Sequence, residues 1–284
     1  LVLAMLGMGA TLRGRDFRDV VREPRAVTLG ITIQLVVVPL TARLFLRLQG
    51  IGGCVAVGLA LIAAIPGGTV SNIFTFLARG NSALSISITA LTTLACLVTT
   101  PLILLLLISD FLPTGFTMPR GRIIAEIALT LLLPLAAGML YLYLYPRTAP
   151  LLSKWRIRGS LVGIALIVIG TASAGRLDVA AFGLGNVALV AGFTLALALM
   201  AGLLPRAMGL ARTDVSAIEL EVIVRNVNLG VLIKASVFPA ATAETASLGD
   251  TVLFCLLLYG ALQLLAGAVL VHLHRRAARA GSQR

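Results

Sequence analysis

Residues 59–80 read LALIAAIPGGTVSNIFTFLARG, and this stretch decides the fold. An apolar run is interrupted by Pro66–Gly68, and three polar residues follow, namely Thr69, Ser71 and Asn72. Proline has no backbone N–H for the helical hydrogen bond, and glycine is a poor helix former. Interrupted helices are tolerated inside a membrane only where their freed backbone groups find partners in protein or water. The stretch therefore predicts a broken membrane helix whose break belongs to a site.

A second interrupted span reads IELEVIVRNVNLGVLIKASVFP over residues 218–239. It carries Glu219 and Glu221, followed by Arg225, Asn226 and Asn228. Charged and amide side chains inside a bilayer are costly unless they are paired or face a cavity, so they mark a functional site. Two interrupted spans at corresponding positions of two halves are typical of the binding site of a secondary transporter.

The composition of the 284 residues agrees with a membrane protein. Hydrophobic residues make up 59% of the chain and charged residues only 12%, whereas a soluble domain has about 25% charged residues. These values exclude an ordinary soluble enzyme and a disordered chain. The formal net charge is +12, but the arginines stand in short clusters between apolar runs, so we expect no nucleic-acid partner. Because HExxH, GxSxG, P-loop and CxxC motifs are absent, we expect no enzyme activity.

Apolar windows predict nine spans that leave no room for a soluble domain. They cover residues 1–12 (a short one), 26–48, 54–78, 83–108, 122–145, 160–175, 179–203, 214–238 and 251–273. With nine crossings every large basic cluster falls on one side of the bilayer. The positive-inside rule then places the C-terminus in the cytoplasm and the protein in the plasma (inner) membrane.

Before its break, the second half of the chain is longer than the first by about one helix and a loop. We therefore expect two inverted five-helix repeats. The first repeat would lack its first helix, either by truncation or naturally. The predicted units are an incomplete first repeat at 1–110, a connecting loop at 111–121, a second repeat at 122–273 and a basic cytoplasmic tail at 274–284. The two histidines, His272 and His274, are expected to be solvated or to face headgroups.

Two broken helices offer binding sites for ions of both signs. Half-helix N-termini suit an anion, whereas unwound carbonyls suit a hard cation such as sodium. A carboxylate would hold the cation, and Glu221 is favoured over Glu219 because it lies about one turn before the second break. Ser85 and Thr89, spaced i, i+4, share one helix face, although such hydroxyls often bond to their own backbone instead. Gln34 is a further polar residue in an apolar span, and its alternative role is to join two helices.

Three stretches resemble the bile acid:sodium symporter family, in the form of a bacterial-type member. Residues 66–94, PGGTVSNIFTFLARGNSALSISITALTTL, are similar to that family's P-G-G-x-x-S-N signature and the segment after it. Residues 5–27 and the glutamine–proline helix ITIQLVVVPL at 31–40 also resemble family segments. The resemblance implies ten helices arranged as a panel and a core domain, with the two broken helices crossing; several animal members lack the first helix.

The resemblance also implies a set of sodium ligands. The first sodium would lie among five matching side chains, which are Ser71, Asn72, Ser85, Thr89 and Glu221. A second sodium would use the same glutamate, backbone carbonyls, Gln34 and a glutamine of the second break. Here Arg225 replaces that glutamine, and a guanidinium has no acceptor with which to ligate a cation. One sodium is therefore expected, and the second is in doubt.

Arg225 has three interpretations: it replaces the second sodium, it faces the cavity and pairs with a substrate carboxylate, or it forms a structural i, i+4 pair with Glu221. Thr69, Asn226 and Asn228 are expected to contact the substrate or act with Arg225 as a switch. We predict sodium-coupled symport of an organic anion, bile acid-like or a small carboxylate, by alternating access. A sodium-independent or proton-coupled carrier, or a non-transporting membrane sensor of the same fold, remains an alternative.

Overall fold

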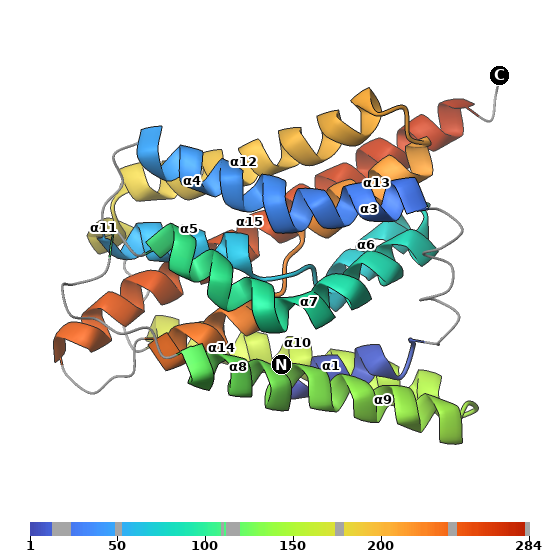
Figure 1. Cartoon of the computed structure of the whole chain (residues 1–284), viewed down its shortest axis with the longest axis horizontal. Helices are drawn as coiled ribbons and strands as arrows, with labels where there is room; N and C mark the ends of the chain where they lie inside the picture. The colour runs from blue at the N-terminus through green and yellow to red at the C-terminus, as the bar shows by residue number, and fades with distance from the viewer. Residues whose placement is uncertain are drawn as a thin grey trace.

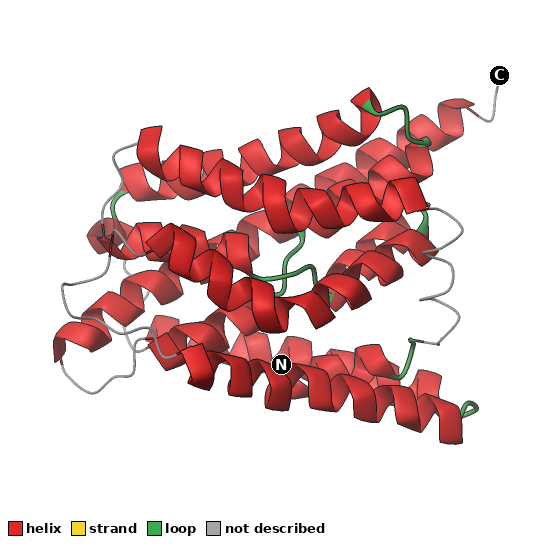
Figure 2. Cartoon of the chain, in the orientation of Figure 1, coloured by secondary structure: helices red, strands yellow, loops and turns green. Residues whose placement is uncertain are grey.

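The chain folds as a bundle of helices (Figures 1 and 2). The computed structural model describes residues 1–12, 24–48, 53–108, 111, 120–173, 179–237 and 243–281, and no β-strand occurs in these ranges. Five helical stretches are long and apolar enough to cross a membrane: Pro24–Arg47, Ser82–Ile108, Gly121–Leu144, Leu184–Ala207 and Leu248–Ala278. The protein is therefore an integral membrane protein.

The helices follow one another in a simple order, with two short π-helical segments inside longer helices. The elements are α1 (Val2–Gly9), α3 (Pro24–Thr32), η1 (Ile33–Val37), α4 (Val38–Leu48), α5 (Gly53–Ala64), α6 (Thr69–Leu77), α7 (Ser82–Ile108), α8 (Arg120–Ile127), η3 (Ala128–Leu132), α9 (Leu133–Leu144), α10 (Ala149–Ser173), α11 (Val179–Phe182), α12 (Leu184–Ala207), α13 (Arg212–Ile223), α14 (Val227–Val237) and α15 (Ala243–Gly281).

Each π-helical segment lies just before a proline. Pro39 follows η1 and Pro134 follows η3 within two residues. A proline inside a helix lacks an N–H and crowds the carbonyl four residues earlier, so one wider turn accommodates it without breaking the helix. The π turn of η1 contains Gln34, which reaches the site described below.

The helices form two layers. In Figure 1, α1, α8, α9 and α10 lie together along the lower side, and most of the remaining helices form a larger layer above them. Helix α14 lies beside α8 and also packs against α5 and α15 of the larger layer. We call the lower group the panel layer and the upper group the core layer. In the panel layer α1 packs against α9 and α10. A Cβ added to Gly138 would lie 2.8 Å from the backbone nitrogen of Ala10, so these backbones approach more closely than any side chain would allow.

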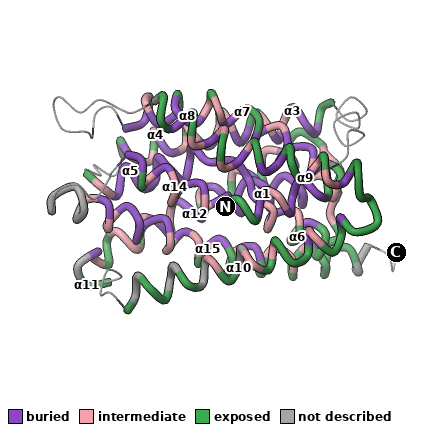
Figure 3. Tube along the Cα trace, turned by 90° about the horizontal axis from the view of Figure 1, so that it is seen from below, coloured by how far each residue is buried: buried purple, intermediate pink, exposed green. Residues whose placement is uncertain are grey.

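The core layer is built around α5. Its residues Val55–Ala64 are all buried, as expected for a helix that is apolar on every side. A Cβ on Gly58 would lie 2.6 Å from Sγ of Cys255, which shows how closely α5 packs against α15. Figure 3 shows buried segments in the middle of the bundle and exposed segments toward its outside.

Both predicted breaks are confirmed, and two helices extend beyond the predicted windows. The window 160–175 belongs to a helix that begins at Ala149, since charged side chains near its start do not interrupt a helix that extends beyond the bilayer. The predicted tail 274–284 is helical as far as Gly281, because alanine and arginine are good helix formers. Most of the predicted loop 111–121 and the basic loop after the first window lie outside the described residues. The repeat boundaries stay a prediction.

Candidate ion-binding site

The two breaks cross each other in the middle of the core layer. Residues 65–68 separate α5 from α6, and residues 224–226 separate α13 from α14. The N–H of Gly68 donates to the carbonyl of Val224 at 3.3 Å, and the N–H of Asn226 donates to the carbonyl of Pro66 at 2.9 Å. This short antiparallel bridge, visible as two loops at the centre of Figure 2, satisfies backbone groups that the broken helices leave free.

Glu221 reaches into this crossing from the last turn of α13. A Cβ on Gly67 would collide with Oε1 of Glu221, so the position requires glycine for space. The glutamate is fully buried, and no Lys, Arg or His side chain pairs with it in the described ranges. A buried carboxylate without an ionic partner needs compensating charge or protonation.

Oxygen atoms from two other helices surround this carboxylate. The hydroxyls of Ser71 and Ser85 lie 2.6 and 3.0 Å from its Oε2, and the hydroxyl of Thr89 donates to its Oε1. The amide oxygen of Asn72 lies 2.7 Å from the hydroxyl of Ser85 and 3.2 Å from that of Thr89. The fold thus brings together all five side chains of the predicted first sodium set, from α6, α7 and α13.

Gln34 connects the oxygen cluster to both breaks. Its Oε1 accepts a hydrogen bond from the N–H of Gly67 at 3.2 Å. Its Nε2 donates to the backbone carbonyl of Glu221 at 3.5 Å. Gln34 therefore lies next to both breaks, and its amide joins two parts of the fold, while its role as a sodium ligand stays a prediction.

Arg225 lies in the second break and points away from the oxygen cluster. Its Nη1 donates to the carbonyl of Ile65 at 2.5 Å and lies 3.3 Å from two further carbonyls at the C-terminal end of α5, those of Ile62 and Ala63. Its Nε donates to the carbonyl of Val222 at 3.0 Å. The C-terminal end of a helix carries free carbonyls and the negative end of the dipole, so the guanidinium caps α5 electrostatically.

Of the three interpretations of Arg225, the structural i, i+4 pair with Glu221 is the one that the geometry does not support. The two side chains form no ion pair, because α13 ends at Ile223 and Arg225 no longer follows the helical spacing. One guanidinium nitrogen, Nη2, has no hydrogen-bond partner among the described residues.

The residues expected to contact a substrate lie at the starts of α6 and α14. Thr69 is the first residue of α6, and Asn226 directly precedes α14. The hydroxyl of Thr69 and the Nδ2 of Asn226 are buried and have no hydrogen-bond partner within the described ranges. Asn228 is half-buried in the first turn of α14. Two helix N-termini with unpartnered polar groups thus meet at the crossing.

Glu219 and His274 do not lie where the sequence placed them. Glu219 is 5% exposed, and its Oε2 lies 3.2 Å from Nη2 of Arg206 and 2.9 Å from Nε2 of His274. His274 is therefore not a solvated tail residue, because α15 continues past the expected end of its span and packs against α13. This second carboxylate is already paired, which leaves Glu221 as the better cation ligand.

Two polar residues of α15 that contact the second break were missed from the sequence. Oε1 of Gln263 accepts from the N–H of Arg225 at 2.7 Å, and the hydroxyl of Tyr259 donates to the carbonyl of Ile223 at 2.6 Å. They are spaced i, i+4 in an otherwise apolar span, the kind of signal that singled out Gln34. Thr75 was also missed; its hydroxyl lies 3.2 Å from that of Ser85.

Comparison with known proteins identifies the family. The model of the sodium bile acid symporter family matches residues 1–181, so this chain belongs to that family, whose members are transporters and not enzymes. The matched part contains the first break, whereas Glu221 and Arg225 lie beyond it. The crossing of the two broken helices brings Glu221 into contact with the hydroxyl oxygens of the matched part.

Several curated relatives are similar to this chain. The uncharacterized sodium-dependent transporter YocS of Bacillus subtilis is 34% identical over 176 residues, which cover 62% of this chain and 54% of the relative. The probable chloroplastic sodium/metabolite cotransporter BASS1 of Arabidopsis thaliana is 36% identical over 138 residues, covering 49% and 33%. The ileal sodium/bile acid cotransporter of Oryctolagus cuniculus is 30% identical over 169 residues, covering 60% and 48%. The matches span about half or less of these relatives.

Proposed function

We propose that this protein is a sodium-coupled secondary transporter that carries an organic anion by symport. The observation that carries the proposal is the environment of Glu221: fully buried, ringed by hydroxyl and amide oxygens and without an ionic partner in the described ranges. The names of the relatives, which mention sodium dependence, bile acid and metabolites, agree with such a role.

The donor set fits a hard cation. The carboxylate of Glu221 and the amide oxygen of Asn72 together offer about six lone pairs that can accept hydrogen bonds. The hydroxyls of Ser71, Ser85 and Thr89 can donate only three protons to them, which leaves lone pairs for a cation. Sodium, as a hard cation, is expected to take oxygen ligands as calcium and magnesium do. A bound cation would neutralise Glu221 and draw α6, α7 and α13 together, which couples ion occupancy to the order of both breaks.

Arg225 supports coupling to one sodium ion. Its guanidinium already places a positive charge at the C-terminal end of α5 and occupies the carbonyl of Val222 in the last turn of α13, just before the second break. A second cation there would lose that carbonyl and meet a fixed like charge. Of the three interpretations of Arg225, replacement of a second sodium is therefore the one its contacts favour.

The substrate site would lie at the N-termini of α6 and α14. Helix N-termini attract anions through free N–H groups and the positive end of the dipole. The unpartnered Nδ2 of Asn226 and hydroxyl of Thr69 offer two further donors for a carboxylate. Because the cation stabilises the same two breaks, each ligand would favour the state that the other needs, which is the condition for coupling.

The orientation follows from the basic residues. The loops at 78–81, 145–148 and 208–211 and the C-terminal end of α15 lie at one end of the molecule, on the right of Figure 2. This end carries Arg79, Arg147, Arg206 and Arg212. By the positive-inside rule it faces the cytoplasm, and we place the protein in the plasma membrane. Movement of the core layer against the panel layer would then expose the site alternately to the two sides.

Uptake by proteoliposomes tests the proposal. Candidate anions, beginning with a bile acid and small monocarboxylates, are offered with a sodium gradient and, in parallel, with choline replacing sodium at two pH values. We expect saturable uptake that requires sodium and varies little with pH. Uptake that follows a proton gradient in choline would identify a proton-coupled carrier, and binding without uptake would identify a sensor; either result contradicts sodium symport.

The number of sodium ions is tested by reversal-potential measurements on the wild type. One sodium ion carried with each monovalent anion moves no net charge, so transport would be electroneutral. Two sodium ions per monovalent anion would move one positive charge, and Arg225→Gln should raise the apparent stoichiometry if the glutamine restores a second site. Two sodium ions coupled to each substrate in the wild type would contradict the role given to Arg225.

A further inference from the structure

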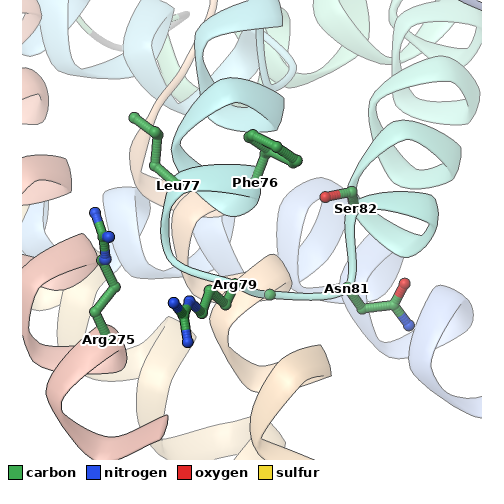
Figure 4. A pocket seen from close by; sticks show the side chains of 7 residues that line it. Phe76, Leu77, Arg79, Asn81, Ser82 and Arg275 are labelled. Carbon is green, nitrogen blue, oxygen red and sulfur yellow. The ribbon is translucent and has the colours of Figure 1, made fainter. Parts of the chain in front are cut away.

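A pocket of about 630 Å³ opens at the basic end of the core layer, away from the oxygen cluster (Figure 4). It lies between the α6–α7 turn and the last turns of α15. Its lining includes Arg79, Asn81 and Ser82 from the turn and Arg275 from α15, together with Phe76 and Leu77 at the end of α6. We call it the Arg79–Arg275 pocket.

The two guanidiniums of this pocket are not neutralised by the part of the chain that the structure describes. Neither Arg79 nor Arg275 has a side-chain hydrogen bond or ion pair with any described residue, and no carboxylate is among the lining residues. The nearby carboxylate of Asp214 accepts a hydrogen bond from Nδ2 of Asn81 at 2.8 Å, and Glu219 is bound to His274. Two unpaired arginines from helices far apart in the sequence form an anion-attracting pair.

The backbone holds Arg79 in an uncommon conformation. Its φ is +60°, in the left-handed region that favours glycine. This conformation ends α6 in a common way, because the N–H of Arg79 donates to the carbonyl of Phe76 at 3.1 Å and that of Gly80 to the carbonyl of Thr75 at 2.9 Å. The N–H of Asn81 donates to the carbonyl of Thr213 at 3.0 Å, so the backbone that carries Arg79 is also held against α13.

The pocket lies where the protein surface changes from apolar to basic. On α6, exposed Phe76 and Leu77 directly precede Arg79, and Phe76 is 73% exposed. On α15, exposed Val269 and Leu273 lie on the turns before Arg275. Because both arginines line one pocket, the two changes occur at the same level, which is where a bilayer passes from acyl chains to headgroups.

We propose that the Arg79–Arg275 pocket binds the phosphate group of an anionic phospholipid, whose acyl chains lie against Phe76 and Leu77. Basic pockets between membrane helices at the cytoplasmic side suit such headgroups, and arginine binds phosphate oxygens through two N–H groups at once. The site joins α6, which carries the first half of the ion-binding cluster, to α15, which supports the second break. Its occupancy does not depend on whether transport is coupled to sodium.

Lipid titrations of the purified full chain in neutral detergent test the site. The melting temperature is followed while short-chain phosphatidylglycerol, phosphatidylcholine with the same chains, or inorganic phosphate is added. We expect stabilisation by phosphatidylglycerol at lower concentrations than by the other two probes. The double variant Arg79→Gln/Arg275→Gln should weaken the phosphatidylglycerol effect by about 30-fold, since each cation contributes about a factor of five near a membrane surface.

A matched variant separates the pocket from bulk charge. Arg156→Gln/Arg212→Gln removes two exposed arginines outside the pocket and should keep the wild-type affinity. Each single pocket variant is measured as well, so that the test does not depend on folding of the double variant. Equal loss in the matched variant, equal affinity for inorganic phosphate, or competition by a transported anion would each overturn the phospholipid assignment.

Discussion

Replacement of Glu221 by glutamine removes the formal charge of the oxygen cluster while it keeps the side-chain volume. A glutamine oxygen in the place of Oε2 can still accept from the hydroxyls of Ser71 and Ser85, and the NH2 group in the place of Oε1 can donate to the hydroxyl of Thr89. The change is therefore a test of charge in a cluster whose packing is preserved.

The magnitude follows from the burial of the carboxylate. Glu221 is fully buried, so water does not screen its attraction for a cation. For a cation about 4 Å away and an effective dielectric constant of about 20, the attraction is about 4 kcal/mol. This corresponds to a loss of roughly 1,000-fold in sodium affinity, which moves half-saturation beyond any practical sodium concentration.

The assay is the melting temperature of the purified protein as sodium chloride replaces choline chloride at constant ionic strength. A ligand that binds only the folded state stabilises it in proportion to the logarithm of its concentration, so the wild type should gain stability with sodium. Glu221→Gln should melt normally in choline and gain nothing from sodium.

Glu219→Gln is the matched control, because Glu219 lies on the same helix and is also buried but pairs with Arg206 and His274. We expect it to lower the melting temperature in both salts and to keep the sodium effect. If Glu221→Gln retained the wild-type sodium response and Glu219→Gln lost it, the ion site would lie elsewhere and the reasoning would fail.

Three further substitutions have outcomes set by their contacts. Gly67→Ala places a Cβ against Oε1 of Glu221. The sodium affinity should therefore fall at least tenfold, and the free energy of unfolding should fall by about 1–3 kcal/mol. Gly138→Val forces α9 from the backbone of α1, so melting should occur earlier in sodium and choline alike. Ser236→Ala removes the hydroxyl that α14 donates to Glu126 of α8, so stability should fall by about 1 kcal/mol with unchanged sodium affinity. Sodium-dependent losses in either of the last two variants would argue against their purely structural roles.

The sequence alone identified a helical membrane protein and the places where two helices break. These features are local: apolar length sets a span, and a Pro-Gly-Gly triplet or a group of polar residues interrupts it. The residue types of the ion cluster were also visible, because hydroxyls spaced i, i+4 share a helix face whatever the rest of the fold does.

The tertiary structure decided which of these polar groups meet. The sequence left three interpretations of Arg225 open, and the break directs its guanidinium to carbonyls about 160 residues earlier in the chain, at the end of α5. His274 and Gln263 found partners on α13 and in the second break only because α15 packs along them. A buried polar group needs a hydrogen-bond partner. Which partner lies within reach depends on how distant segments pack against each other, and local sequence spacing does not specify that packing.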